Sequence, residues 1–213
     1  KDCWTLTRSL MADNTPYYET GAKIGYTSDN GRWFLSGLVL NGWQQIRRPD
    51  GNTRLAIGTQ VTFKPSSRVT LHSSTFLGGR PDASNRNRFF HNLYGIFQLT
   101  DKLGLTADFD YGIDQRQAGA SQYDAWSSWV GILKYQFSPK ISMAGRLEKY
   151  TDKTGLVIST NTPNGFQVLA YSVNIDYAIL SNCAWRIEAR RLDSQDAIFE
   201  KAGKNTSSDF VLT

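Results

Sequence analysis

The sequence predicts an all-β fold, an antiparallel up-and-down β-barrel of about twelve strands that crosses a membrane. Three observations predict it. Alternating apolar and polar residues recur in runs of about ten residues, the length at which a tilted strand crosses a bilayer. Short turns and longer polar connections alternate along the chain. Aromatic residues recur beside the short turns.

The expected strands follow one another along the chain, each bounded by turn residues. They lie near 3–9, 18–27, 32–42, 54–63, 68–77, 88–99, 103–114, 125–137, 141–151, 166–177, 183–192 and from 208 onward. Tight turns are expected at 29–31, 64–67, 101–102, 138–140 and 181–182, and longer connections near 10–17, 43–53, 78–87, 115–124, 152–165 and 193–207. Because every second connection of a meander leaves the same edge, the short turns share one side, which is periplasmic in outer-membrane barrels.

Period-two alternation gives each strand an apolar and a polar face. In 103–114 the apolar face is Leu103, Leu105, Ala107, Phe109, Tyr111 and Ile113, and the polar face is Gly104, Thr106, Asp108, Asp110, Gly112 and Asp114. The same separation is expected in 54–63, 141–151 and 183–192. The residues that share the apolar parity are expected to face lipid; they include Trp33, Leu55, Ile57, Phe63, Leu105, Phe109, Leu133, Trp185 and Ile187.

The polar faces predict a wetted interior wall. Its expected pore-lining members are Asp108, Asp110, Asp114, Arg146, Glu148, Asn174, Arg186, Glu188 and Arg190. Strands 141–151, 166–177 and 183–192 are consecutive, so their polar residues should lie side by side on one wall. These charges either face the aqueous interior or form salt bridges that satisfy one another, and the sequence favours neither reading.

Aromatic residues next to the short turns distinguish a membrane barrel from a soluble one. A soluble barrel has the same alternation, with the apolar face turned toward a core. Here Tyr26, Trp33, Phe63, Phe137, Tyr177 and Trp185 lie beside short turns on successive strands. Such a ring is typical of the aromatic girdle of a membrane barrel, in this case on the periplasmic side. We therefore favour the membrane barrel.

Composition narrows the class of protein further. The chain has 213 residues, and we expect a single β-barrel domain over 1–213. No apolar run approaches the ~18 residues of a membrane-spanning helix, which excludes a helical membrane protein. The net charge is +5, but Lys and Arg occur singly or in pairs, so nucleic acid is not an expected partner. Cys3 and Cys183 are too few for a disulfide framework, and a single bridge between them stays open.

Catalytic, cofactor and metal sites are not expected. The two histidines, His72 and His91, lie within strands, and no serine lies in a Gly-x-Ser-x-Gly motif. Asp108 and Asp110 are spaced so that both point to the interior, and they are interpreted as interior charges before an acid/base pair. Acidic residues of the loops lack the spacing of a calcium-binding loop.

Seven segments carry a resemblance to a known family. They are Trp4 to Leu10, Pro16 to Lys23, Leu40 to Gln44, Arg88 to Asn92, Asp108 to Gly112, Arg146 to Asp152 and Trp185 to Arg190. In their order and spacing, over nearly the whole chain, they resemble the β-barrel porin family of OmpL-like outer-membrane proteins. Members of that family usually run well over a hundred residues longer at the amino end. The resemblance implies the carboxy-terminal part of a larger barrel of about sixteen strands.

The resemblance also implies an activity and a location. It implies an integral protein of the bacterial outer membrane that acts as a porin-like channel for passive diffusion of small hydrophilic solutes or ions. Its expected partners are outer-membrane lipids and those solutes, with no cofactor. Two alternatives stay open: a barrel that displays its loops without pore activity, and, ranked below it, an outer-membrane barrel enzyme.

Overall fold

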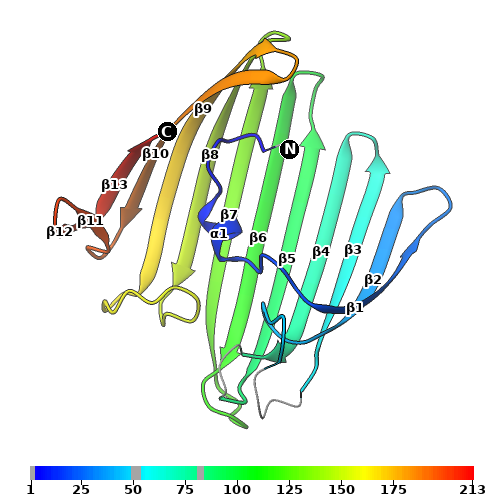
Figure 1. The fold of residues 1–213 in the computed structure, drawn as a ribbon, viewed down its shortest axis with the longest axis vertical. Helices are drawn as coiled ribbons and strands as arrows, with labels where there is room; N and C mark the ends of the chain where they lie inside the picture. Colours follow the sequence, from blue (N-terminus) through cyan, green and yellow to red (C-terminus); the bar gives the residue numbers. More distant parts are fainter. Residues whose placement is uncertain (1–2, 49–53, 81–83) are drawn as a thin grey trace.

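The computed structural model describes residues 3–48, 54–80 and 84–213. It contains one 11-stranded antiparallel sheet in which β1 to β10 are paired in chain order and β13 pairs with β10 (Figure 1). The strands of this sheet are β1 (Gly21–Thr27), β2 (Trp33–Leu40), β3 (Ala56–Ser66), β4 (Val69–Gly79), β5 (Asn87–Gln98), β6 (Leu103–Gln115), β7 (Tyr123–Gln136), β8 (Ile141–Asp152), β9 (Phe166–Leu180), β10 (Cys183–Ser194) and β13 (Ser208–Leu212). The predicted all-β, up-and-down fold is confirmed.

The alternation of short and long connections is also confirmed. Short turns join β1 to β2, β3 to β4, β5 to β6, β7 to β8 and β9 to β10 at one edge of the sheet, and the longer connections leave the other edge (Figure 1). Of the connections expected from the sequence, residues 49–53 and 81–83 lie outside the described residues. Each strand pairs with its neighbours over most of its length, as in β6 and β7, where Phe109 lies opposite Trp129.

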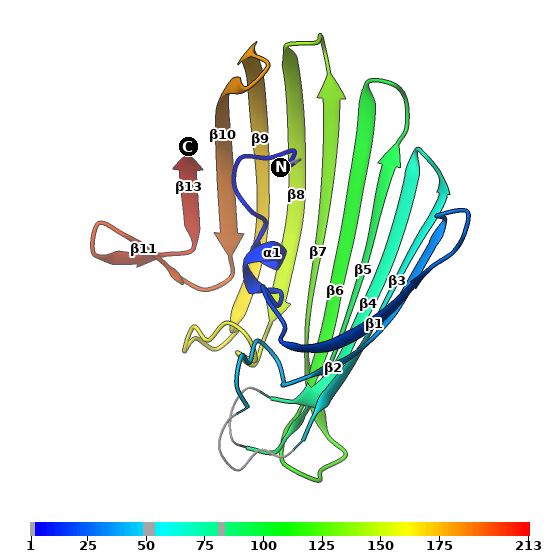
Figure 2. The ribbon, with the colours of Figure 1, turned by 45° about the vertical axis from the view of Figure 1, so that its right-hand side comes forward.

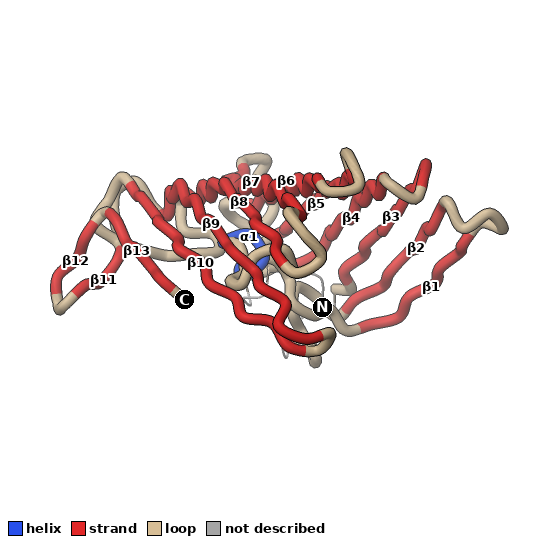
Figure 3. The backbone as a smooth tube through the Cα atoms, turned by 90° about the horizontal axis from the view of Figure 1, so that it is seen from above, coloured by secondary structure: helices blue, strands red, loops and turns tan. Residues whose placement is uncertain are grey.

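The sheet is curved into a trough, and its hollow contains the beginning of the chain. Seen from above, α1 (Leu10–Asn14) lies inside the curve of the strands (Figure 3). The edge strands β1 and β13 are not paired with each other in the part of the chain that the structure describes. The described sheet is therefore an arc of a barrel wall whose concave side faces α1 (Figure 2).

Exposure along single strands distinguishes the two faces. In β8 the convex face carries Leu147, which is 46% exposed, whereas its neighbours Arg146 and Glu148 on the concave face are 3% and 1% exposed. β6 shows the same contrast between an exposed apolar face and a buried charged face, since Phe109 is 42% exposed and Asp110 is 3% exposed. A soluble barrel would bury the leucine and the phenylalanine instead. An apolar outer face with buried charges behind it is the pattern of a membrane-spanning barrel.

The expected strand at 3–9 is wrong. These residues run across the concave face instead and lead into α1, which is capped by Ser9 through a hydrogen bond from the Ala12 backbone N–H, at 3.1 Å. The backbone N–H groups of Leu6 and Thr7 donate to side chains of β9 and β10, so they are unavailable to a neighbouring strand. Among the described residues, no helix is long and apolar enough to span a bilayer.

The expected connection at 193–207 contains structure of its own. It holds a small hairpin, β11 (Phe199–Lys201) and β12 (Lys204–Thr206), which forms a separate two-stranded sheet. Ala202 and Gly203 form its turn, with φ angles of 52° and 76°. Two successive positive φ angles are typical of a type I′ turn, which joins the two strands of a hairpin through a two-residue loop.

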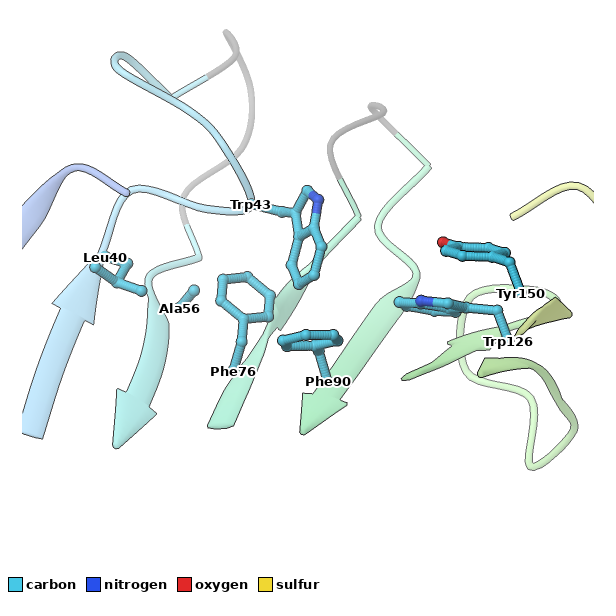
Figure 4. Packing of buried hydrophobic residues seen from close by; sticks show 7 residues of the cluster. All are labelled: Leu40, Trp43, Ala56, Phe76, Phe90, Trp126 and Tyr150. Atoms are coloured by element: carbon cyan, nitrogen blue, oxygen red, sulfur yellow. The ribbon is translucent and has the colours of Figure 1, made fainter. Parts of the chain in front are cut away.

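An apolar cluster lies on the concave face near the long loops. It consists of Leu40, Trp43, Ala56, Phe76, Phe90, Trp126 and Tyr150, all 5% exposed or less (Figure 4). Trp43 comes from the connection after β2 and packs edge-on against Phe76 and Phe90, with ring centroids 5.1 Å apart in both cases. Leu156, Val157 and Ile158 of the connection after β8 pack against this cluster. Two long connections therefore fold inward over the loop end of the trough.

Candidate functional site

The concave face and the segment that crosses it form the candidate functional site. Residues 3–20, named here the inner segment, begin near the short-turn edge, where Arg186 donates to the Cys3 carbonyl at 3.0 Å. The segment ends at the loop edge, where Glu19 accepts a hydrogen bond from the Gln44 backbone N–H at 3.4 Å. It therefore crosses the concave face from the short-turn end of the strands toward their loop end (Figure 1).

Side chains of the wall hold the inner segment by accepting hydrogen bonds from its backbone N–H groups and from one of its hydroxyl groups. Asn174 Oδ1 accepts from Leu6 N–H at 3.0 Å, and Glu148 Oε2 accepts from Leu10 N–H at 2.6 Å. Asp110 accepts from the hydroxyl of Thr15. Hydrogen bonds to a charged acceptor are stronger than neutral ones, so the two carboxylate contacts in particular fix the path of a segment that has little regular structure.

Four charged residues of the wall form one buried network beneath the inner segment. The guanidinium of Arg146 lies 3.1 Å from Glu148 and 2.9 Å from Glu188, and Arg190 lies 2.7 Å from Glu148. Arg146 also donates to the carbonyl of Thr7 at 2.8 Å. The two positive and two negative groups balance one another. The side chains of Arg146, Glu148 and Glu188 are 0–1% exposed, and that of Arg190 is 11% exposed.

Two of the other predicted interior residues lie at opposite ends of the wall. Arg186 pairs with Asp176 at 2.7 Å near the short-turn edge. Asp114, near the loops, accepts two hydrogen bonds from Arg88, both at 2.7 Å, and is 1% exposed. The guanidinium carbon of Arg88 in turn lies 4.8 Å from the ring centroids of both Trp43 and Trp126.

Asp108 and Asp110 both accept a hydrogen bond from Asn92. The side-chain amide of Asn92 donates to Asp108 at 2.6 Å and to Asp110 at 2.7 Å. The structure therefore brings Arg146, Glu148, Asn174, Glu188 and Arg190 together under the inner segment. It leaves Asp108 and Asp110 on a separate part of the same face, and Arg186 and Asp114 near its opposite ends.

The predicted girdle residues lie on the outer face near the short turns. Tyr26, Trp33, Phe137, Tyr177 and Trp185 are all 41% exposed or more. Phe63 stacks on Trp33 across β2 and β3, with ring centroids 4.1 Å apart. Exposed rings at one edge of successive strands are suited to the level of the lipid headgroups.

Each of the two histidines contacts a hydroxyl group, and neither contact was predicted from the sequence. His72 Nδ1 lies 2.8 Å from Thr62 Oγ1 on the concave face, and His91 Nε2 lies 2.9 Å from Ser73 Oγ on the outer face. Ser73 and His91 belong to paired strands, where backbone N–H groups form the hydrogen bonds between strands rather than an oxyanion hole.

Within the described residues, no three His, Cys, Asp or Glu side chains gather in a way that could hold a metal ion. Cys3 and Cys183 are exposed and not bonded to each other.

Two functional features were not anticipated from the sequence. The first is the inner segment, whose partners on the wall lie more than 90 residues away along the chain. The second is the inward position of Trp43, which is only 4% exposed. A tryptophan in a mostly polar connection is the one sequence signal that could have indicated an inward loop.

Comparison with known proteins identifies the family. A model of the family described as "Putative beta-barrel porin-2, OmpL-like" matches residues 1–213. The chain belongs to this family of OmpL-like β-barrel porins. It is accordingly an integral β-barrel protein of the bacterial outer membrane. No curated protein matches the chain.

Solved porin structures are similar to the chain in fold. The NanC porin shares 16% sequence identity at a TM-score of 0.50, over 93% of this chain and 91% of that one. The KdgM porin, solved alone and in complex with disordered oligogalacturonate, shares 16% identity at TM-scores of 0.39 and 0.40, over 82% of this chain and 86% of each of those chains. At this identity the likeness to NanC concerns the fold, an antiparallel porin sheet.

Proposed function

We propose that the chain forms the wall of an outer-membrane channel through which small hydrophilic solutes or ions diffuse passively along the concave face. The main supporting observation is the distribution of side chains over the two faces of the sheet. Charged and amide side chains are buried on the concave face, and leucine and phenylalanine side chains are exposed on the convex face. Lipid surrounds the convex face in this proposal, and the nine predicted interior residues face the solute pathway or the inner segment that borders it.

Catalysis has no part in this proposal. The Ser73 and His91 pair lies on the convex surface, and among the described residues no carboxylate is hydrogen-bonded to its imidazole. A hydrolase of the serine type needs such an orienting group and an oxyanion hole. In this proposal residues 1–213 form a single β-barrel domain, with lipids and small solutes as its partners.

Conductance in a planar bilayer tests the proposal. The purified protein should produce discrete current steps in salt solution, because an aqueous pathway carries ions. The steps should persist when exposed convex residues such as Leu147 are replaced by other apolar residues. The same current from empty detergent controls, or an absence of steps at any protein concentration, would contradict the channel.

A second candidate is a plugged barrel that displays its loops. The inner segment crosses the concave face, and the cluster around Trp43 covers its loop end, so two features favour it specifically. The variant Glu188→Gln loosens the inner segment and separates the two candidates. A plugged barrel should conduct only in the variant, whereas a channel should conduct in both proteins.

A further inference from the structure

A cavity of about 430 Å³ lies on the concave face between the inner segment and strands β2 to β6. Its volume is within the range of small-molecule sites. The wall contributes polar side chains that include Gln60, Ser74, Asn92, Tyr94 and Asp108. The inner segment closes the opposite side with residues that include Tyr17 and Glu19. The cavity is separate from the buried network around Arg146, none of whose members line it.

We infer that this cavity is a binding subsite for a small, uncharged, hydroxyl-rich solute, a monosaccharide in its chemical class. The inference rests on the proposed channel function, since it names the class of solute that pauses beside the inner segment. Its support comes from the polar groups, the aromatic surfaces and the charge of the cavity.

The polar groups of the cavity can both donate and accept hydrogen bonds. Gln60 and Asn92 carry amides, Ser74 and Tyr94 carry hydroxyls, and Asp108 carries acceptor oxygens. Neighbouring hydroxyls of a sugar each need one donor and one acceptor, so a mixed wall of this kind matches them better than a row of like charges would. Orientation by a few placed polar groups is typical of small-molecule sites.

These groups are held in place before any solute arrives. Asn92 donates to both Asp108 and Asp110, and Asp110 accepts from Thr15 of the inner segment. Gln60 accepts hydrogen bonds from Lys23 at 2.6 Å and from Ser36 at 3.2 Å. A site whose side chains are already ordered loses less entropy when a ligand binds.

Aromatic rings provide an apolar surface within the same cavity. The ring of Tyr94 stacks on His72, with centroids 4.7 Å apart and an angle of 20° between the planes. Phe76 and Phe90 also line the cavity, and each is 5% exposed or less. One face of a pyranose ring is covered by C–H groups, which pack against flat apolar surfaces, while its hydroxyls reach the polar groups.

The charge of the cavity disfavours an acidic solute. The cavity is lined by two acidic residues, Asp108 and Glu19, and, among the described residues, by one cation, Arg8. Arg8 is itself engaged, because its guanidinium lies 3.0 Å from Asp13 and 5.2 Å from the ring centroid of Tyr17. Like charges repel in a partly desolvated site, so a sugar carboxylate should bind more weakly than the uncharged sugar.

Glucose and glucuronic acid are the probes for the test, because they differ by one carboxyl group. Titration of glucose into the protein in detergent should give saturable binding by calorimetry, and glucose should add noise to the open-channel current. Glucuronic acid at pH 8 should bind at least tenfold more weakly. Equal binding of the two sugars would overturn the inference.

Variants locate the binding within the molecule. Ser74→Phe fills the cavity and should weaken glucose binding at least tenfold, whereas Thr106→Phe, on the same face but outside the lining, should not. Tyr94→Leu removes the stacking surface and gives a second reading if Ser74→Phe fails to fold. Glucose binding that survives both Ser74→Phe and Tyr94→Leu would overturn the inference.

The subsite and the channel can fail separately. Current steps without saturable glucose binding would disprove the subsite and leave the channel intact. Saturable glucose binding without current steps would support the subsite and count against the channel.

Discussion

Thr7 donates two hydrogen bonds to the same oxygen of Glu188, one from its backbone N–H at 2.6 Å and one from its hydroxyl at 2.9 Å. The other oxygen of Glu188 accepts from Arg146 at 2.9 Å. One buried carboxylate of β10 therefore joins the inner segment to the charged network of the wall. Because Glu188 is 1% exposed, the loss of its charge cannot be compensated by water.

Glu188→Gln should release the inner segment and destabilise the protein by about 3–5 kcal/mol, the usual cost of removing one partner of a buried ion pair. The expected measurements are a larger single-channel conductance and faster proteolysis within residues 3–20. Asp193→Asn is the control, since it breaks an exposed pair with Arg191 and should cost about 0–1 kcal/mol. An unchanged conductance together with unchanged proteolysis would show that Glu188 does not hold the segment.

Phe109→Arg should destabilise folding into lipid vesicles by about 2–4 kcal/mol, because an outward side chain at mid-strand meets hydrocarbon. Ile57→Arg should behave in the same way, since Ile57 is 54% exposed on the same convex face. Phe109→Thr should cost much less. If Phe109→Arg folded as well as the parent and Asp110→Leu did not fold, the two faces would be assigned the wrong way round.

Cysteine labelling should reveal which edge of the sheet faces the outside. In a background with Cys3→Ser and Cys183→Ser, a cysteine at Ser121 should react with an impermeant reagent added to intact cells, because it lies in a long connection. A cysteine at Lys140 should react only after the outer membrane is opened, because it lies in the short turn before β8. Labelling of the Lys140 variant in intact cells would reverse the topology.

Burial raises the pKa of Glu19 to about 7, against a lowering effect of the hydrogen bond from the Gln44 backbone N–H. The folded protein therefore binds this proton more tightly than the unfolded chain, whose value is 4.5. The free energy of unfolding should fall as the pH rises from 4.5 to about 7, and Glu19→Gln should reduce that slope. Urea unfolding at pH 5 and pH 8 measures it, with Glu200→Gln as an exposed control. A slope that is equal in both variants would refute the assignment.

The faces and turns of the sheet could be predicted because their causes are local. A period of two assigns Phe109 and Asp110 to opposite faces whatever the partner strands are, and turn residues such as Asn30 and Gly31 lie between the strands they separate. The β11 and β12 hairpin was missed because Ala202 occupies a positive-φ position where the sequence signal is normally Asn, Asp or Gly.

The path of the inner segment could not be predicted because its causes are distant. Leu6 and Asn174 are 168 residues apart, and Leu10 and Glu148 are 138 apart. Residues 3–9 have the alternation of a short strand, and only the amide of Asn174 and the carboxylate of Glu188 on the wall decide that the N–H groups of Leu6 and Thr7 point elsewhere. The nine interior residues could be assigned to a face, but which of them pair with one another depends on the same distant contacts.

The double variant Arg186→Glu and Arg190→Glu tests whether the wall charges influence ion selectivity. Arg186 pairs with Asp176, and Arg190 pairs with Glu148, each at 2.7 Å. Reversing both leaves four carboxylates where two neutral pairs stood, so the reversal potential in a salt gradient should move toward cation preference. Asp108→Asn is the matched control and should move it the other way, because it removes a negative charge from the cavity wall. Both side chains of the double variant are partly exposed in the parent, at 27% for Arg186 and 11% for Arg190, which places their charge within reach of passing ions. An unchanged reversal potential in open channels of the double variant, with the expected shift in Asp108→Asn, would assign Arg186 and Arg190 to structure alone.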